Sequence, residues 1–172
     1  MRCSLIKFIN CLVYLAILGL VSQAIGMSLP RKAFNPKRVP YRSYAWEKDG
    51  RIYEKIKIKK WKTRVPDVSR VVRSMLPKKI DSRPKSAQAE QMAKETCVAE
   101  SVHVFLSVLG FGCIFVWRGV GGITVSVLYA LGNVPFILIQ RYNRPRQLEL
   151  ASLLKLQETK NANNGGSYES AQ

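Results

Sequence analysis

The chain has 172 residues, of which 28 are Lys or Arg and 11 are Asp or Glu, so its formal charge at pH 7 is +17. Apolar residues nevertheless make up 47% of the sequence. Charge and apolarity occupy separate stretches, which excludes an ordinary soluble domain, where the two are mixed. The pattern predicts an all-α membrane protein with an N-terminal signal or anchor segment, a basic interfacial region, a long helix and a transmembrane helical hairpin.

Three runs reach the roughly 20 apolar residues that a helix needs to cross a bilayer core. They are residues 8–29, about 98–117 and 120–140. We therefore divide the chain into four segments. They are a signal peptide or membrane anchor (1–29), a basic interfacial region with a short amphipathic helix (30–85), a long helix and transmembrane hairpin that carry the proposed site (86–148), and a short interfacial helix with a disordered tail (149–172).

The first apolar segment fits both a cleaved signal peptide and a retained anchor. Arg2 and Lys7 precede it, and Ser22, Gln23 and Ala24 supply small residues of the kind that a signal peptidase reads. The positive-inside rule favours an anchor whose N-terminus lies outside, because the basic region that follows then stays in the cytoplasm.

Residues 31–85 hold nineteen Lys and Arg against five Asp and Glu. A surface of this charge suits nucleic acid, anionic lipid or a phosphorylated ligand, and charge alone does not choose among them. Attachment to apolar segments at both ends favours lipid head groups, and no nucleic-acid reader motif accompanies the charge, so we predict no nucleic-acid partner. Aromatic residues that favour a membrane interface are interleaved with the basic ones: Tyr41, Tyr44, Trp46, Tyr53 and Trp61.

Helix signals continue after the basic connector. Asp67 is a plausible N-cap, and the apolar residues from Val68 to Leu76 share one helical face before Pro77 ends the helix. A long helix is predicted for residues 86–117, and the glycine-rich turn at 118–122 sends the chain back as a hairpin. A short helix after Leu148 and a disordered tail from residue 161 complete the predicted elements.

A polar stripe runs along the predicted long helix. Thr96, Glu100, His103 and Ser107 have the spacing i, i+4, i+7, i+11, which keeps them on one face. His103 is the only histidine and is suited to act as a general base, with Glu100 one turn earlier to fix its tautomer. The alternative is a solvated pair at the end of the helix with no chemical role.

A second polar cluster ends the last apolar segment. Its arginines can hold phosphate or carboxylate groups in bidentate fashion, and as a hairpin the chain brings it to the same membrane face as the stripe. The alternative is ordinary anchoring by a basic cap with an interfacial Tyr. The members are Gln140, Arg141, Tyr142, Asn143, Arg144 and Arg146, with Asn133 and Pro135 deeper in the helix.

Other site chemistries find little support. The cysteines, Cys3, Cys11, Cys97 and Cys113, form no C-x-x-C pair and have no zinc-like spacing with His, so we predict no metal, no cofactor and no disulfide framework. Cys97 lies beside the stripe but is more typical of a buried thiol than of an acyl-carrying nucleophile. No G-x-S-x-G, Walker or dinucleotide motif is present.

Several motifs together resemble the glycosyl-4,4'-diaponeurosporenoate acyltransferase family, over about residues 46–148. They are Ile58-Lys59-Lys60-Trp61-Lys62 with Pro66-Asp67, the segment from Glu95 to His103, Asn133-Val134-Pro135, and Gln140-Arg141-Tyr142-Asn143-Arg144-Pro145-Arg146. The resemblance implies the last step of staphyloxanthin-type carotenoid synthesis, in which a fatty acyl group is esterified to the glucose 6-hydroxyl.

The leading hypothesis is a membrane-bound O-acyltransferase in the cell membrane, with its active face in the cytoplasm. His103, oriented by Glu100, deprotonates the sugar hydroxyl of a glycosylated isoprenoid lipid. The fatty acyl donor is acyl-CoA, acyl carrier protein or a phospholipid. Its binding site is assigned to Arg141, Arg144 and Arg146, with Asn143 or Tyr142 on the oxyanion and with Asn133, Gln140 and Thr96 nearby. The alternative is a non-catalytic membrane protein whose basic region binds anionic lipid or recruits a partner enzyme.

Overall fold

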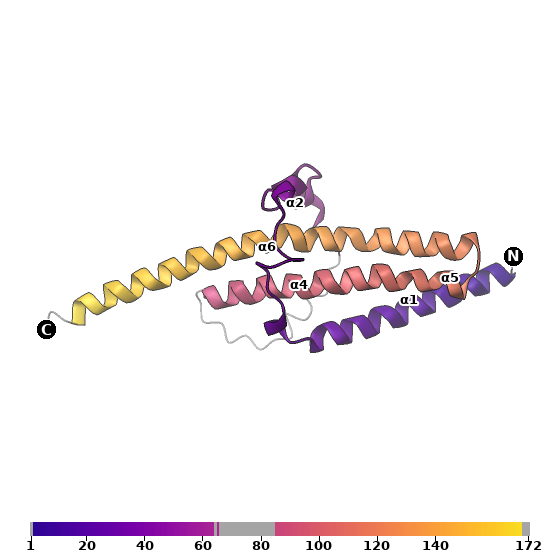
Figure 1. Cartoon of the computed structure of the whole chain (residues 1–172), viewed down its shortest axis with the longest axis horizontal. Helices are drawn as coiled ribbons and strands as arrows, with labels where there is room; N and C mark the ends of the chain where they lie inside the picture. The colour runs from indigo at the N-terminus through magenta and orange to yellow at the C-terminus, as the bar shows by residue number, and fades with distance from the viewer. Residues whose placement is uncertain (1, 64, 66–84, 170–172) are drawn as a thin grey trace. The chain divides into compact units, whose positions relative to one another are not determined.

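The computed structural model describes residues 2–63, 65 and 85–169, and the regular structure in this part of the chain is entirely helical (Figure 1). The predicted all-α fold is confirmed. The helices are α1 (Arg2–Ser28), α2 (Ile58–Trp61), α4 (Ser86–Leu109), α5 (Cys113–Val116) and α6 (Val120–Glu169). Four 3₁₀ turns connect them: η1 (Arg31–Ala33), η2 (Ala45–Glu47), η3 (Arg51–Glu54) and η4 (Gly110–Gly112).

Three helical stretches are long and apolar enough to cross a membrane: Cys3–Ser28, Ser86–Val116 and Val120–Asn161. They cover the three apolar runs of the sequence, except for residues 29 and 117. The predicted amphipathic helix that begins at Asp67 lies outside the described residues.

The chain forms two compact units. The first, here called the helical unit, combines Met1–Asn35 with Glu95–Arg141. The second, here called the basic unit, combines Pro36–Lys94 with Tyr142–Gln172. Each unit therefore joins segments that are far apart in the sequence.

In the helical unit, α1 lies beside the end of α4, α5 and the start of α6 (Figure 1). Cys11, Leu15 and Cys113 form its buried apolar centre. The Tyr14 hydroxyl donates to the Leu109 carbonyl at 2.7 Å, while Gly26, near the other end of α1, adjoins Val102. These contacts show that α1 runs antiparallel to α4.

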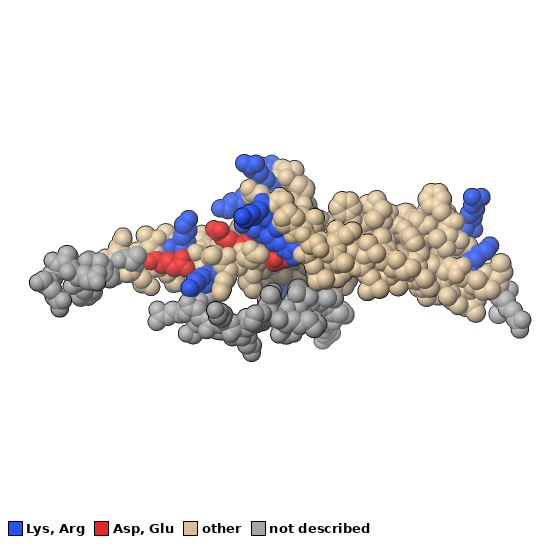
Figure 2. Space-filling view, turned by 90° about the horizontal axis from the view of Figure 1, so that it is seen from below, with Lys and Arg blue, Asp and Glu red and all other residues tan. Residues whose placement is uncertain are grey.

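The outward surface of the helical unit suits hydrocarbon. Phe105, Phe115 and Leu128 are 63%, 83% and 63% exposed. Lys and Arg are absent from residues 8–30, 95–117 and 119–140, so the middle of this unit has no basic side chain. The broad tan surface in Figure 2 shows that charged side chains are few on one face. Exposed apolar side chains of this kind favour lipid contact over water.

The predicted turn lies between α5 and α6. Gly119 has φ +105°, a backbone conformation that side chains disfavour, which explains a glycine at this position. The structure differs in detail from the predicted single helix over residues 86–117. In the structure α4 ends at Leu109, and the chain continues through η4 and α5. Gly110 and Gly112 account for this, because both weaken an α-helix and both allow tyrosine rings to approach. The rings belong to Tyr129 and Tyr14.

We expect Gly122→Ala to destabilise this hairpin by about 1–3 kcal/mol, the usual cost of overpacking. A Cβ at Gly122 would lie 2.7 Å from the Cys113 carbonyl oxygen and would also collide with the Trp117 carbonyl. Gly132→Ala, in the same helix, is the matched control because nothing lies within 4 Å of its Cβ position. The measurement is the free energy of unfolding in mixed micelles, and equal effects of the two variants would contradict the described packing.

Beyond the hairpin, α6 continues as one helix to Glu169. The sequence instead predicts a short helix after residue 148 and a disordered tail from residue 161. The structure is helical over both segments as far as Glu169. Residues 146–160 contain no Gly or Pro, and a helix that has already formed elongates at little cost. That continuity explains why no break separates the predicted short helix from the hairpin helix.

In the basic unit, the chain from Pro36 to Lys62 makes successive short turns. The Glu47 carboxylate, 2% exposed, accepts a hydrogen bond from the Tyr44 backbone N–H at 2.7 Å and one from the Tyr53 hydroxyl. Glu158 of α6 accepts bonds from the Ser86 backbone N–H and hydroxyl at 2.9 and 2.6 Å. A carboxylate at this position caps the first turn of α4 and complements the helix dipole.

Candidate functional site

One end of the helical unit holds a buried ion pair. The Arg141 Nη1 atom of α6 lies 2.7 Å from Glu100 Oε1 of α4, and the two side chains are only 12% and 9% exposed. The structure therefore brings together one member of the predicted stripe and one member of the predicted terminal cluster. It also places both at the same end of this unit, as the hairpin prediction requires.

A second ion pair lies at that end. The Arg31 Nε atom is 2.9 Å from Glu95 Oε1, and Arg31 Nη1 donates to the carbonyls of Gly26, Met27 and Leu29. Arg31 thereby caps the C-terminus of α1, where a positive charge is favourable. Sequence reasoning missed this role because nothing in the local pattern sets Arg31 apart from the eighteen other basic residues of its region.

His103 is held by Asn133. Its Nδ1 atom is 2.9 Å from the Asn133 side-chain oxygen, while the Asn133 amide nitrogen donates to the Tyr129 carbonyl at 2.9 Å. Because the amide group is used as a donor on one side, its oxygen is the acceptor towards the imidazole. Nδ1 therefore carries the hydrogen in the neutral ring, and Nε2 keeps the lone pair.

This partner differs from the predicted one. Glu100 is committed to Arg141, and Asn133 reaches His103 from the facing helix. The Phe136 ring stacks on the imidazole with centroids 4.6 Å apart and an interplanar angle of 13°. His103 is thus fixed by a hydrogen bond and by a ring contact, both from α6.

The remaining predicted residues of this unit flank that pair. Thr96 is 5% exposed and lies on α4 one turn before Glu100, and Gln140 is partly buried beside Arg141 in the sequence. The Ser107 hydroxyl donates to the His103 carbonyl at 2.8 Å. The stripe is therefore an inward-facing row with one imidazole and one carboxylate.

The predicted cluster beyond Arg141 belongs to the basic unit. Tyr142 is 1% exposed, with Arg146 Cζ at 3.6 Å and Lys62 Nζ at 4.8 Å from its ring centroid. Lys62 also donates to the Asn143 side-chain oxygen at 3.1 Å. Tyr142 is thus enclosed between two cations, an arrangement that favours both charges over the ring face.

The two other arginines of the cluster also contact protein groups. Arg144 is 2% exposed, and its Nη1 atom donates to the Tyr41 carbonyl at 2.6 Å. Arg146 pairs with Glu54 at 2.7 Å and donates to the Tyr142 carbonyl at 2.7 Å. These contacts fasten the Tyr41–Lys62 segment to α6. Sequence spacing could not find Tyr41, Glu54 and Lys62 as partners, although Lys62 belongs to a motif of the family resemblance.

Glu54 is held in its charged form. The hydrogen bond from Lys59 lowers the pKa of this exposed carboxyl most, and the charges of Lys59 and Arg146 add to the effect. A lowered carboxyl pKa stabilises the folded state above the unfolded pKa, and that contribution is lost as the pH falls through the folded value. The Glu54–Arg146 contact is therefore fully formed at neutral pH.

We expect Arg144→Lys to loosen the basic unit, because a lysine cannot reproduce the planar donor set of a buried guanidinium. Limited proteolysis of the segment around Tyr41 should become several-fold faster. Arg51→Lys, at an exposed position of the same segment, is the control and should leave the rate unchanged. Equal protection in both variants would show that Arg144 does not hold this segment.

The cysteines take no part in these clusters. All four are free thiols, and three of them, Cys11, Cys97 and Cys113, are buried. Among the described residues, no group of three or more His, Cys, Asp and Glu side chains is arranged to hold a metal ion.

Comparison with known proteins points to one family. The family model described as glycosyl-4,4'-diaponeurosporenoate acyltransferase matches residues 32–152. Proteins of that name from Staphylococcus aureus strains bovine RF122 / ET3-1, MRSA252 and USA300 are 32%, 31% and 30% identical to this chain over 148 residues. Each alignment covers 84% of this chain and 88% of the relative. No solved structure matches the chain.

Proposed function

The chain belongs to the glycosyl-4,4'-diaponeurosporenoate acyltransferase family, and we propose that it transfers an acyl group to a glycosylated diaponeurosporenoate. The family resemblance of the motifs is confirmed, and the chain is an acyltransferase. We further propose that the acceptor atom is the glucose 6-hydroxyl and that the acyl group is a fatty acyl chain. The non-catalytic alternative is set aside by family membership.

The observation that carries the mechanism is the His103–Asn133 hydrogen bond. It supports a neutral ring with the hydrogen on Nδ1, and we propose that Nε2 is the base. Nε2 accepts the proton of the sugar hydroxyl while the hydroxyl oxygen attacks the acyl carbonyl carbon of the donor. The carbon–sulfur bond of a thioester donor, or the carbon–oxygen bond of an ester donor, then breaks. The imidazolium returns its proton to the leaving group, so the enzyme ends unchanged.

The neighbouring charges have separate proposed roles. The charge of Arg141 is partly neutralised by Glu100. Arg141 binds the phosphate-bearing part of an acyl-CoA, acyl carrier protein or phospholipid donor. Thr96 and Gln140 flank the reacting groups. Arg144, Arg146 and Tyr142 hold the basic segment, and Asn143 orients Lys62. This assignment follows the contacts of each side chain and replaces the ligand-binding roles predicted for Tyr142, Asn143, Arg144 and Arg146 by structural ones.

The proposed setting is the cell membrane with the active face in the cytoplasm. Three candidate spans support membrane insertion. In the helical unit, Arg31, Glu95, Glu100 and Arg141 gather at one end, and the basic region begins at that end of α1. The positive-inside rule assigns such an end to the cytoplasm.

The test is mass spectrometry of carotenoids from cells that make glycosyl-4,4'-diaponeurosporenoate, with and without this chain. We expect a product heavier by one fatty acyl group only when the chain is present, and mild alkali should release the original glycoside because the new bond is an ester. Fragmentation should place the acyl group on the glucose 6-hydroxyl. Identical carotenoid profiles in the two strains would overturn the proposed substrate.

A further inference from the structure

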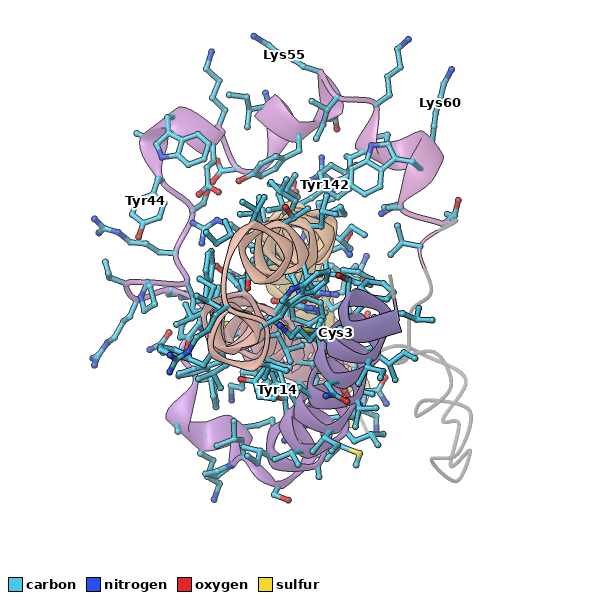
Figure 3. All side chains as sticks on the ribbon, turned by 90° about the vertical axis from the view of Figure 1, so that its right-hand side faces the viewer. Cys3, Tyr14, Tyr44, Lys55, Lys60 and Tyr142 are labelled. Atoms are coloured by element: carbon cyan, nitrogen blue, oxygen red, sulfur yellow. The ribbon has the colours of Figure 1, made fainter. Side chains whose placement is uncertain are left out.

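A short exposed segment of the basic unit carries three lysines around an isoleucine. Lys55, Ile56, Lys57 and Lys60, here called the Ile56 patch, are all exposed, and Ile56 is 49% exposed. Figure 3 shows Lys55 and Lys60 directed away from the ribbon. The next apolar residue, Ile58, is completely buried. The chain therefore buries one isoleucine and exposes the other two positions earlier.

The conformation that exposes Ile56 is fixed by its neighbours. Lys57 has φ +55°, a left-handed conformation that is uncommon for a residue other than glycine, and it is the N-cap of α2. The Trp61 indole nitrogen donates to the Ile56 carbonyl at 2.9 Å. The left-handed residue and this hydrogen bond fix the backbone at Ile56, whose side chain stays exposed.

The charge of the patch is uncompensated within the described residues. Glu54, the nearest carboxylate in the sequence, pairs with Lys59 at 3.0 Å and with Arg146 at 2.7 Å. Among the residues that the structure describes, Lys55, Lys57 and Lys60 have no carboxylate partner. Three positive charges without a described carboxylate partner thus lie within four residues of one exposed apolar side chain.

We propose that the Ile56 patch binds the anionic head groups of a lipid leaflet, with Ile56 inserted at the boundary with the acyl chains. Charge complementarity supports this occupant, because each lysine near an anionic surface contributes about 1 kcal/mol. Trp46 and Val39, 58% and 61% exposed in the same unit, add side chains that favour the interface. The chain also has candidate membrane spans, which would anchor it to a lipid bilayer. This binding is independent of the acyl-transfer proposal.

The test uses the full chain in nanodiscs of phosphatidylcholine alone or of phosphatidylcholine with phosphatidylglycerol. A water-soluble acetylating reagent modifies exposed lysines, and mass spectrometry gives the rate at each position. We expect Lys55, Lys57 and Lys60 to react about fivefold more slowly with phosphatidylglycerol present, which corresponds to about 1 kcal/mol at each lysine. A water-soluble peptide that carries one lysine, added to both samples, is the reference and should react equally with both discs.

A pair of variants tests the apolar part of the patch. Ile56→Ser should remove most of the protection, whereas Ile56→Leu, which keeps an apolar side chain of the same size, should leave it unchanged. Equal rates in the two lipid compositions would overturn the proposal. Protection that appears only when an acidic acyl carrier protein is added would also overturn it and assign the patch to a protein partner.

Discussion

Replacing His103 with alanine should lower acyl transfer by about 10²–10⁴-fold, the usual contribution of a positioned general base. His103 is the only histidine of the chain, so no second imidazole can take over the proton. The loss should appear in kcat, because the imidazole acts in the proton transfer that accompanies attack by the sugar hydroxyl. It is measured with the purified chain in nanodiscs containing the glycosylated acceptor and an acyl donor.

The control for this variant is Ser107→Ala. Ser107 lies one turn further along the same helix face, and its hydroxyl donates a hydrogen bond to the His103 carbonyl at 2.8 Å. Its removal should change turnover by less than about threefold, since only one local hydrogen bond is lost. Membrane insertion of both variants is checked by their yield in the membrane fraction. Unchanged turnover in His103→Ala would remove His103 from the mechanism.

Breaking the Glu100–Arg141 pair should give the largest loss of stability among the charged residues. Removal of one partner of a buried ion pair costs about 3–5 kcal/mol. Glu100→Gln and Arg141→Gln should each show this loss, while the double variant should recover much of it. The readout is the free energy of unfolding in mixed micelles, analysed as a double-mutant cycle.

The Arg31–Glu95 pair provides the matched comparison. Its separation of 2.9 Å is similar, but its side chains are 24% and 44% exposed. Exposed pairs contribute about 0–1 kcal/mol, so Glu95→Gln should have a small effect. Purely additive losses in the Glu100–Arg141 cycle would contradict a direct interaction between those two side chains.

The helical architecture follows from the sequence because its signals are local. Runs of about 20 apolar residues and the glycines near residue 119 suffice to predict two long helices that turn back on each other. The length of α6 could not be predicted in the same way. The polar composition after residue 160 is typical of a disordered tail, whereas helix elongation depends on the turns that precede it.

Residue types of the site could be predicted, but not their pairing. The spacing of Glu100 and His103 places them on one helix face and so favours a contact between them. The structure pairs each with a residue of α6, Arg141 and Asn133, which depends on the register between two helices. Nothing in a single sequence fixes that register. The partners of Arg144 and Arg146, Tyr41 and Glu54, lie in a segment of short turns whose path cannot be predicted from local spacing.

The most direct test of the proposed chemistry is ¹⁵N NMR of the single histidine in the full chain. The central claim is that Asn133 holds the neutral imidazole with its hydrogen on Nδ1, so that Nε2 is the base. At neutral pH, the spectrum of histidine-labelled protein in nanodiscs should show a protonated Nδ1 and an unprotonated Nε2, and Asn133→Leu should lose this preference. A ring protonated on Nε2 in the unmodified protein would contradict the account.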